Sequence, residues 1–273
     1  MNYIGETVKH KEYGLGTVVE QNGRLITVVF PKHGKKVFKK SILEKHVMGI
    51  VDKESEGIKE FLRARKVRHL IHFTQLDNLN SILDRGVLPK NDLIKEGIEG
   101  HFNDLQRLDG CGDCTCLSVE YPNVWLLDRY RSSTPNGRWV ILVLNAELLI
   151  NHTNYYARHN AGSNEVRNII RTCNTITDFK NLYSDNFTIH LTTGSRYVSR
   201  KGIEELNYLP TSDQAEILTK GRISPGEIQS IIFQSDEDKV QFENDNRCRK
   251  IRLLVNSSLF DTYRRDYKNF GIR

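Results

Sequence analysis

The 273-residue sequence contains no uninterrupted apolar run long enough to cross a bilayer. No signal peptide is expected, because Met1-Asn2-Tyr3-Ile4 leads directly into charged residues. Both absences predict a cytoplasmic protein without membrane contact. A hydrophobic content of 38% and a charged content of 27% are those of an ordinary globular protein. The length allows one large or two modest domains, with enough chain to bury a substantial core.

The cysteines are few and lack the arrangement of a structural zinc site. Cys111, Cys114 and Cys116 form a C-x-x-C-x-C cluster. No second pair at metal-ligand spacing follows, since Cys173 and Cys248 are isolated. In a cytoplasmic protein all five thiols are expected to be reduced. The sequence therefore predicts no metal site, and it indicates a tight turn that carries thiols.

Acidic residues are scarce at the start of the chain. Residues 1–50 contain nine Lys and Arg but only four Glu, a net charge of +5, while the other 223 residues hold only one of the six net positive charges. A basic excess confined to a small segment is typical of a polyanion-binding attachment. A well-solvated surface would give the same composition.

Residues 1–48 have the pattern of a small β module. Short runs rich in β-branched residues alternate with glycine-containing turns, and Asn22-Gly23 predicts a hairpin because both residue types accept the positive φ angles of a type I′ turn. The pattern G-x-x-V-x-H-x-x-Y-G-x-G-x-V, which begins at Gly5, resembles small SH3- or Tudor-like β-barrels that bind proteins or nucleic acid. The lysines expected along one edge are Lys32, Lys35, Lys36, Lys39 and Lys40.

Residues 49–66 are expected to form a linker that enters an amphipathic helix, and residues 67–273 a larger domain. The segment 70–86 organises this domain. Its apolar run turns polar at His72 and Thr74 and continues with Leu and Ile at helical spacing until a final glycine. Strand ends of this kind present polar groups to ligands from a rigid backbone. The alternative is a plain strand–helix junction with a hydrogen-bonded core histidine.

Four motifs occur in a fixed order along the larger domain. They are His72-Phe73-Thr74 with Asp77-Asn78-Leu79-x-Ser81-Ile82-Leu83-x-x-Gly86, Asn103-Asp104-x-x-Arg107-Leu108-Asp109, Ser118-Val119-Glu120-Tyr121-Pro122-Asn123, and Pro210-Thr211-x-x-Gln214-Ala215-Glu216. Together they span about residues 67–235 and resemble the DarT family, bacterial NAD-dependent ADP-ribosyltransferases that modify nucleobases in DNA, usually as toxins of toxin–antitoxin pairs. The resemblance implies an α+β ADP-ribosyltransferase fold, with two small splayed β-sheets around a cleft that holds NAD.

The resemblance also implies roles for single residues. Glu216 matches the catalytic glutamate, whose carboxylate would accept the ribose 2′-hydroxyl and favour the positive charge that develops as nicotinamide leaves. A solvated strand face is the alternative for this residue. His72 and Thr74 match residues that hold the two riboses, or the nicotinamide amide, of NAD.

Arg107 matches an arginine near the diphosphate and the incoming base, where a guanidinium binds oxygens bidentately. An ion pair with Asp104 or Asp109 is the alternative. Asn78 would connect its loop to the cofactor, or it would cap the following helix.

Two further positions are candidates for the cofactor site because of their place at a helix start. Asn160 and Ser163, at the expected start of a helix over residues 164–172, would cradle a phosphate or the nicotinamide amide, or act as plain caps.

Gln214 would position the acceptor, because an amide can hydrogen-bond a nucleobase or a side-chain amide better than it can an arginine.

Residues 193–208 are expected to form a polar loop that mixes cations with aromatic rings. Such a mixture suits a single strand, whose bases stack on rings while its phosphates meet cations. A solvated connector is the alternative. The candidate contacts are Arg196, Tyr197, Arg200 and Lys201.

The sequence therefore predicts an NAD-dependent transferase that attaches ADP-ribose to a base of single-stranded DNA, as a bacterial toxin or anti-phage effector. A macrodomain-type antitoxin is the partner that the resemblance implies. Three alternatives stay open: an RNA acceptor, a protein acceptor addressed by Gln214, and an inactive module that binds NAD or nucleic acid. The sequence leaves the modified base and the ligand of the barrel undetermined.

Overall fold

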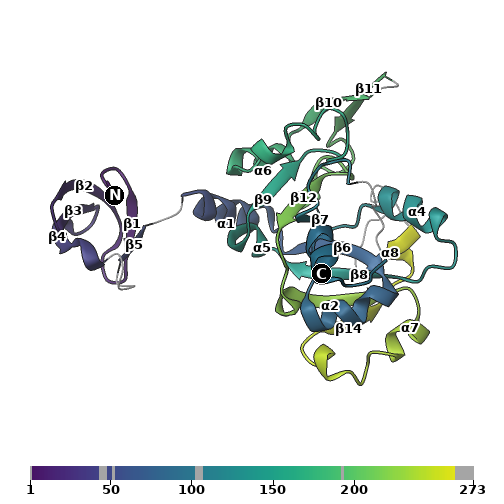
Figure 1. The fold of residues 1–273 in the computed structure, drawn as a ribbon. Coiled ribbons are helices and arrows are strands. Elements are labelled where there is room, and N and C mark those ends of the chain that lie inside the picture. The colour runs from purple at the N-terminus through teal and green to yellow at the C-terminus, as the bar shows by residue number, and fades with distance from the viewer. Residues whose placement is uncertain (1, 43–47, 51–52, 102–106, 192–193, 262–273) are drawn as a thin grey trace. The chain divides into compact units, whose positions relative to one another are not determined.

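The structure is a computed structural model that describes residues 2–42, 48–50, 53–101, 107–191 and 194–261. The chain forms two compact units, residues 1–59 and 60–273, each of which is described by itself (Figure 1). Within the described ranges, no helix is long and apolar enough to cross a membrane.

The first unit is an antiparallel sheet in the order β4-β3-β2-β1-β5. Its strands are β1 (Thr7–His10), β2 (Gly14–Asn22), β3 (Leu25–Phe30), β4 (Gly34–Lys39) and β5 (Met48–Ile50). The hairpin between β2 and β3 turns one residue later than expected. Asn22 still pairs with Leu25, so the turn consists of Gly23 and Arg24, and of these only Gly23 has a positive φ angle, of 56°.

The core of this unit lies on one side of the sheet. Alternate residues of β3 (Ile26, Val28 and Phe30) are buried and pack against Val8 and Val18, as the period-two pattern of a half-buried strand requires. The strand order leaves β4 and β5 at opposite ends of the sheet. The described residues thus form an open sheet, and the closed barrel expected for residues 1–48 is not seen in them.

The second unit combines a seven-stranded sheet with a separate hairpin and short helices. Its helices and turns of 3-10 helix are α1 (Lys53–Arg65), η2 (Leu76–Asn78), α2 (Leu79–Arg85), α3 (Lys90–Glu96), α4 (Val124–Ser133), α5 (Leu148–Asn151), η3 (Ile170–Thr172), α6 (Ile176–Asn181), η4 (Pro225–Glu227), α7 (Asp236–Val240), η5 (Asn246–Cys248) and α8 (Ser258–Asp261), α1 beginning in the first unit. Its strands are β6 (His69–Gln75), β7 (Cys114–Val119), β8 (Trp139–Asn145), β9 (Asn154–Ala157), β10 (Asn186–Leu191), β11 (Gly194–Ser199), β12 (Glu216–Lys220), β13 (Ile228–Phe233) and β14 (Arg252–Val255).

The large sheet runs in the order β14-β13-β8-β6-β7-β12-β9, and β10 pairs with β11 in the hairpin. The continuous apolar run at residues 139–144 forms β8, the fully buried strand at the centre of one half of the sheet. Trp139, Ile141 and Val143 belong to a core cluster that α4 and α8 cover. The fold is therefore a mixed α and β fold with several sheets.

The two halves of the large sheet are joined over a short length. β6 pairs with β8 along all seven residues, but with β7 only at Leu70–Val119 and Ile71–Ser118 in the described residues. Glu120 extends this junction, since its backbone N–H donates to the His69 carbonyl over 3.1 Å. The two sheets expected from the sequence are thus two halves of one sheet that separate after Ile71.

At the end of α2, the backbone of Gly86 lies very close to the backbone of Ile223. The φ angle of Gly86 is 87°, and a Cβ atom at this position would lie 2.0 Å from the carbonyl oxygen of Ile223. That oxygen accepts a hydrogen bond of 2.9 Å from the N–H of Val87. Only glycine fits here, because the obstacle is backbone and cannot rotate away.

We expect Gly86→Ala to lower the free energy of unfolding by about 3 kcal/mol, because it combines an unfavourable φ angle with a steric clash. Gly97→Ala is the matched control, since Gly97 also ends a helix with a positive φ angle but has no atom within 4 Å of its Cβ position. This variant should cost about 1 kcal/mol. Urea unfolding of both variants measures the difference, and equal losses would contradict the close approach.

Candidate functional site

A cavity of about 760 Å³ opens in the second unit where β6 and β7 separate. Its volume is in the range of pockets that hold small ligands and cofactors. Nine of the twelve site residues expected from the sequence line it: His72, Thr74, Asn78, Arg107, Asn160, Ser163, Arg196, Gln214 and Glu216. The other three, Tyr197, Arg200 and Lys201, are outside the lining.

His72 spans the gap between the separating strands. Its Nδ1 lies 3.0 Å from the carbonyl oxygen of Cys116 on β7. A carbonyl only accepts, so Nδ1 carries the proton and Nε2 of the neutral ring is an acceptor. Burial lowers the pKa of His72, and the charge of Arg107 lowers it further, against the opposite effect of the bond to Cys116. The ring therefore stays neutral at pH 7 and lines the cavity.

Asn78 fixes a loop to the end of β6. Its Nδ2 donates to Thr74 Oγ1 over 2.9 Å and to the His101 carbonyl over 3.0 Å, and its Oδ1 accepts from the His101 N–H over 2.9 Å. It makes no side-chain cap to α2, so the capping alternative is wrong. Thr74 is buried and thereby held in position on the cavity wall.

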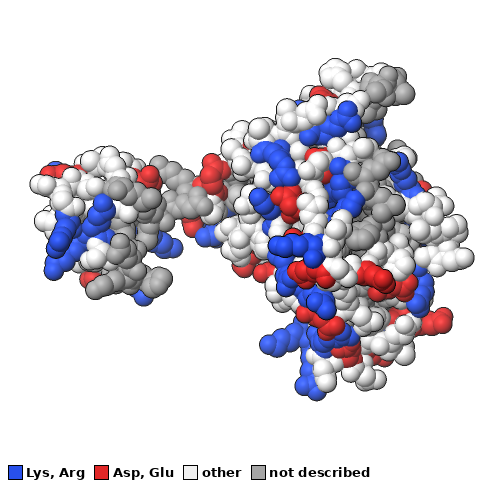
Figure 2. All heavy atoms as spheres, viewed as in Figure 1, with Lys and Arg blue, Asp and Glu red and all other residues white. Residues whose placement is uncertain are grey.

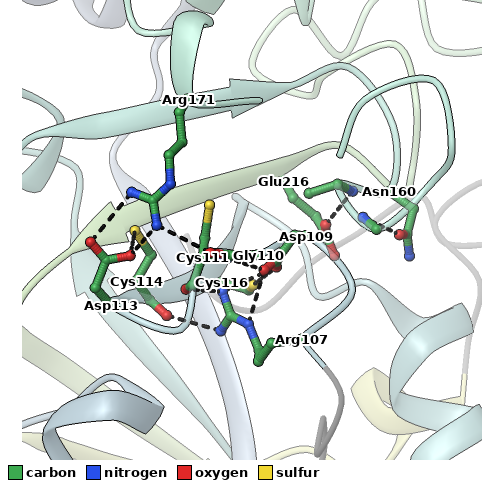
Figure 3. Close-up of polar contacts among 12 residues, drawn as sticks. Arg107, Asp109, Gly110, Cys111, Asp113, Cys114, Cys116, Asn160, Arg171 and Glu216 are labelled. Atoms are coloured by element: carbon green, nitrogen blue, oxygen red, sulfur yellow. Dashed lines mark hydrogen bonds and ion pairs between the residues drawn. The ribbon is translucent and has the colours of Figure 1, made fainter. Parts of the chain in front are cut away.

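Glu216 is the first residue of β12 and is only 5% exposed, so a solvated strand face is excluded. Its Oε2 accepts a hydrogen bond of 2.8 Å from the N–H of Ala161 (Figure 3). The neighbouring Asn160 stabilises the same turn, because its Oδ1 accepts from the N–H of Gly162 over 2.8 Å. The carboxylate is thus oriented by a backbone amide of a loop that itself lines the cavity.

The helix expected over residues 164–172 is absent from the described structure. Turns occupy this segment up to residue 169, and only Ile170–Thr172 forms a turn of 3-10 helix. A helix N-terminus therefore cannot supply the phosphate site that we expected at Asn160 and Ser163. Asn160 and Ser163 instead lie at the start of these turns and line the cavity.

Three buried polar side-chain atoms on lining residues have no hydrogen-bond partner in the described structure. They are Thr115 Oγ1, Asn123 Nδ2 and Ser163 Oγ, and the fourth such atom is Trp139 Nε1 in the core. Buried unpaired polar groups are costly and rare. Their concentration around one cavity indicates a site built for polar ligand atoms or ordered water.

Arg107 is held by its own turn (Figure 3). Its Nε donates to Asp109 Oδ1 over 3.2 Å, and its Nη2 lies 3.0 Å from Asp109 Oδ2. The guanidinium also donates to the carbonyls of Cys111 and Cys114, over 2.6 and 2.9 Å. The ion pair within the loop is therefore present with Asp109, while Asp104, like Asn103, lies outside the described residues. Arg107 shapes the cysteine turn and places its charge beside the cavity.

Two thiols of the cysteine turn pack in an apolar cluster. Cys111 and Cys114 are buried against Tyr155, Ile170 and Leu218. Burial, with a smaller effect from the charge of a neighbouring aspartate, raises the pKa of Cys114 to about 12. This thiol is protonated at neutral pH and serves as a packing residue.

His159 is a site residue that the sequence did not single out. It is 7% exposed, lines the cavity, and its Nδ1 lies 3.1 Å from Ser212 Oγ. The same hydroxyl accepts from the N–H of Gln214 over 3.1 Å. Burial, followed by the charge of Arg196, lowers the pKa of His159 to about 4. The only sequence signal was its place directly before Asn160, and the contact to Ser212 bridges 53 residues.

The expected loop at residues 193–208 begins as a strand. Residues 194–199 form β11, which pairs with β10 in register from Asn186–Ser199 to Leu191–Gly194. Arg196 and Tyr197 are both exposed on this strand, Tyr197 by 66%. Lys201, two residues after the end of the strand, is exposed as well.

Arg200 is buried, unlike its neighbours. Its guanidinium donates to the carbonyls of Leu209 and Leu206, over 2.8 and 3.2 Å. These bonds tie β11 to the segment that leads into Gln214 and Glu216. The expectation that Arg200 contacts nucleic acid is therefore wrong, because its donors hold the protein backbone.

The comparisons with known proteins identify one family. The family model "ssDNA thymidine ADP-ribosyltransferase, DarT" matches residues 71–261. No curated protein matches the chain.

Several solved structures are similar at low sequence identity. DarTG of Thermosipho africanus in complex with ADP-ribose has 17% identity and a TM-score of 0.48 over 71% of this chain and 51% of that one, so our chain spans about half its length. DarT of Thermus sp. 2.9 in complex with NAD+ has 14% identity and a TM-score of 0.45, over 70% of this chain and 96% of that one. The same protein in complex with ADP-ribosylated ssDNA has 13% identity and a TM-score of 0.48, over 71% and 97%.

The lowered pKa of His159 predicts acid sensitivity. An unfolded histidine binds a proton below its ordinary pKa of 6.5, whereas His159 in the folded protein binds one only near 4. Stability is therefore lost as the pH falls between these values, by about 1.4 kcal/mol per pH unit. From pH 7 to pH 5, the wild type should lose about 2 kcal/mol more than His159→Asn, which does not titrate but can still bond Ser212. Urea unfolding at both pH values measures this difference, and equal losses would show that His159 is not buried as a neutral ring.

Proposed function

The chain belongs to the DarT family of ssDNA thymidine ADP-ribosyltransferases, as its motifs indicated, and we propose that its cavity binds NAD and a thymine base together. ADP-ribose is then transferred from NAD to this base in single-stranded DNA. The observation that supports the proposal is that residues from four distant motifs, including His72 and Glu216, line one cavity.

The lining residues fit a dinucleotide. The neutral ring of His72 offers Nε2 as an acceptor for a ribose hydroxyl, and the buried Glu216 carboxylate is a second acceptor. Thr115 Oγ1, Asn123 Nδ2 and Ser163 Oγ would gain the partners that the described structure does not give them. Thr74 and Asn78 would define the wall beside the nicotinamide end. NAD supplies the ADP-ribose group and releases nicotinamide.

Glu216 is the residue that we assign to transition-state stabilisation. Breaking the glycosidic bond leaves positive charge on the ribose, as in glycoside hydrolysis. A carboxylate that is only 5% exposed acts on this charge through a low dielectric. Its orientation is fixed in advance by the N–H of Ala161, so little reorganisation is needed when the charge develops. Arg107 is held by its ion pair with Asp109, whose negative charge it balances, and its guanidinium would contact the diphosphate of NAD.

Gln214 is the residue that we assign to the acceptor base. Its side-chain amide can donate and accept at once, which matches the alternating carbonyl and N–H groups of thymine. The backbone of Gln214 is held through Ser212, which in turn contacts His159. A base must leave its stack to enter such a cavity, which is easiest in a single strand. Arg196 on the cavity wall and Tyr197 beside it would contact a phosphate and a neighbouring base.

We further propose the domain organisation read from the sequence: an SH3- or Tudor-like module at 1–48, a linker and helix at 49–66, and the transferase domain at 67–273. Because the family description names single-stranded DNA, DNA is favoured over RNA or protein as acceptor. A role as a toxin, and a macrodomain-type antitoxin as its partner, are proposals that rest on the family resemblance.

Glu216→Gln should lower ADP-ribose transfer by at least about 100-fold, because an amide keeps the bond to Ala161 but carries no charge. Transfer is measured with labelled NAD and a thymidine-containing oligonucleotide. An oligonucleotide in which every thymidine is replaced by deoxycytidine should stay unlabelled. The control is Glu205→Gln, which removes an exposed carboxylate outside the cavity lining. Transfer by Glu216→Gln at the wild-type rate would refute the assigned role.

Gln214→Glu should separate transfer from NAD cleavage. The carboxylate cannot donate to a base carbonyl, so transfer to DNA should fall by roughly 10- to 100-fold, as expected for one lost hydrogen bond and an added charge. The rate of NAD hydrolysis, in which water replaces the base as acceptor and nicotinamide is released, should change by less than about threefold. Gln214 is assigned to the base and not to NAD. Gln241→Glu, an exposed position on the end of α7, adds the same charge as a control. A parallel loss of both reactions would place Gln214 in the NAD site.

A further inference from the structure

The first unit has a strongly basic surface that the transferase site does not use. Residues 2–42 contain eight Lys and Arg but three Glu. Five of these lysines fall within or beside the β3–β4 hairpin: Lys32, Lys35, Lys36, Lys39 and Lys40. Figure 2 shows Lys and Arg side chains gathered over β4 on the face of this unit that it draws. The family match begins only at residue 71, beyond this unit.

The strand register divides these lysines between the two faces of the sheet. On β3, Ile26, Val28 and Phe30 point into the core, so their partners on β4 share the inner face. Lys35 and Lys39 pair with Val29 and Leu25, and therefore share the outer face. They flank Val37, from which each is two residues away, so each lysine stands about 7 Å from Val37 along the strand.

The outer face is exposed, and it also carries Glu20 of β2, whose carboxylate accepts a hydrogen bond of 3.4 Å from Thr27 Oγ1. Val37 is 62% and Leu25 47% exposed, and both lysines are exposed as well. Among the described residues, no carboxylate lies within ion-pair distance of Lys35 or Lys39, whereas many cations of the second unit pair with carboxylates. Lys36, on the inner face, lies 5.5 Å from the centroid of the Tyr13 ring.

We propose that the outer face of β3 and β4, with Lys35 and Lys39 as its charged contacts, Val37 between them and Leu25 beside Lys39, binds the phosphate backbone of single-stranded DNA at nucleotides other than the modified one. This inference rests on the proposed function, because it takes the second unit's substrate as its ligand. The two lysines are four residues apart on one strand, about 13 Å, so each meets a separate phosphate. The aliphatic side chains of Val37 and Leu25 beside these lysines contact sugars without selecting a base.

Neither a protein partner nor protection of a sheet edge accounts for this face as well as DNA does. Lysine is depleted in the cores of protein–protein interfaces, which argues against a protein partner. Lysines also protect exposed sheet edges from pairing with other chains. Edge protection explains a lysine or two on β4, but not why the excess charge of the whole protein is concentrated in this unit.

A second contact on the same strand would act through effective concentration. Once the first unit has bound the backbone of a strand, the second unit binds a base of the same strand in an intramolecular step. Long oligonucleotides should therefore be better substrates than short ones through a lower KM, and kcat should be unaffected because the cavity is unchanged.

The test uses the full chain with Lys35→Glu and Lys39→Glu combined. We expect KM for a 40-nucleotide single strand to rise about 10-fold or more, with kcat unchanged. We expect the slope of log affinity against log salt to become shallower by about 1.4, which corresponds to two lost phosphate contacts. A five-nucleotide substrate, which has few phosphates beyond those next to the modified base, should be used by this variant as well as by the wild type. Arg249→Glu with Lys250→Glu, two exposed cations of the second unit outside the cavity lining, changes the net charge equally and should leave KM unchanged.

The outcomes separate this inference from the proposed function. If the wild type labels no oligonucleotide, the proposed function fails. If the wild type labels DNA while Lys35→Glu with Lys39→Glu keeps its KM and salt slope, the docking face is refuted. Unchanged DNA binding together with new self-association in gel filtration would refute it in favour of edge protection. Thermal melting of the glutamate double variant and of a second double variant, Lys35→Gln with Lys39→Gln, controls for misfolding. The glutamine double variant should show the same changes in KM and salt slope, but smaller ones.

Discussion

The whole site depends on the short junction between β6 and β7. Two residue pairs and the neighbouring Glu120 join the halves of the large sheet, and beyond Ile71 the strands separate. The His72 ring then bridges to the Cys116 carbonyl. A longer junction would close the cavity, and a shorter one would leave the halves unconnected. The polar residues at the end of β6 consequently face a space rather than a neighbouring strand.

The electrostatics of the cavity follow from its burial. His72 and His159 are kept neutral because a positive charge would be poorly solvated there, and the charges of Arg107 and Arg196 act in the same direction. The charged groups Arg107 and Glu216 are paired or hydrogen-bonded, Arg107 with Asp109 and Glu216 with the N–H of Ala161. The site thus presents neutral histidine rings and the buried, oriented carboxylate of Glu216 among other charged lining residues, and this carboxylate suits a substrate that becomes positively charged.

Local patterns misplaced some elements for identifiable reasons. Residues 164–172 contain good helix-forming residues, yet they form turns, because tertiary contacts there outweigh a weak propensity. The polar run at 193–208 contains a strand that, among the described residues, pairs with its own hairpin partner alone, so neither of its faces needs to be apolar. Arg200 has the same composition signal as its exposed neighbours, but its guanidinium satisfies backbone carbonyls of a segment that the fold brings to it.

The sequence by itself determined the family, the reaction type and nine of the residues that line the cavity, because spaced motifs record which side chains the chemistry requires. It also determined that positive charge is concentrated in the first unit, since charge is a property of composition. Only the tertiary structure decided that His159 and Ser212 support Gln214, that Arg107 is bound to its own turn, and that the first unit is an open sheet in the described residues. These outcomes depend on backbone geometry and on contacts between residues that the fold brings together, which no local pattern encodes.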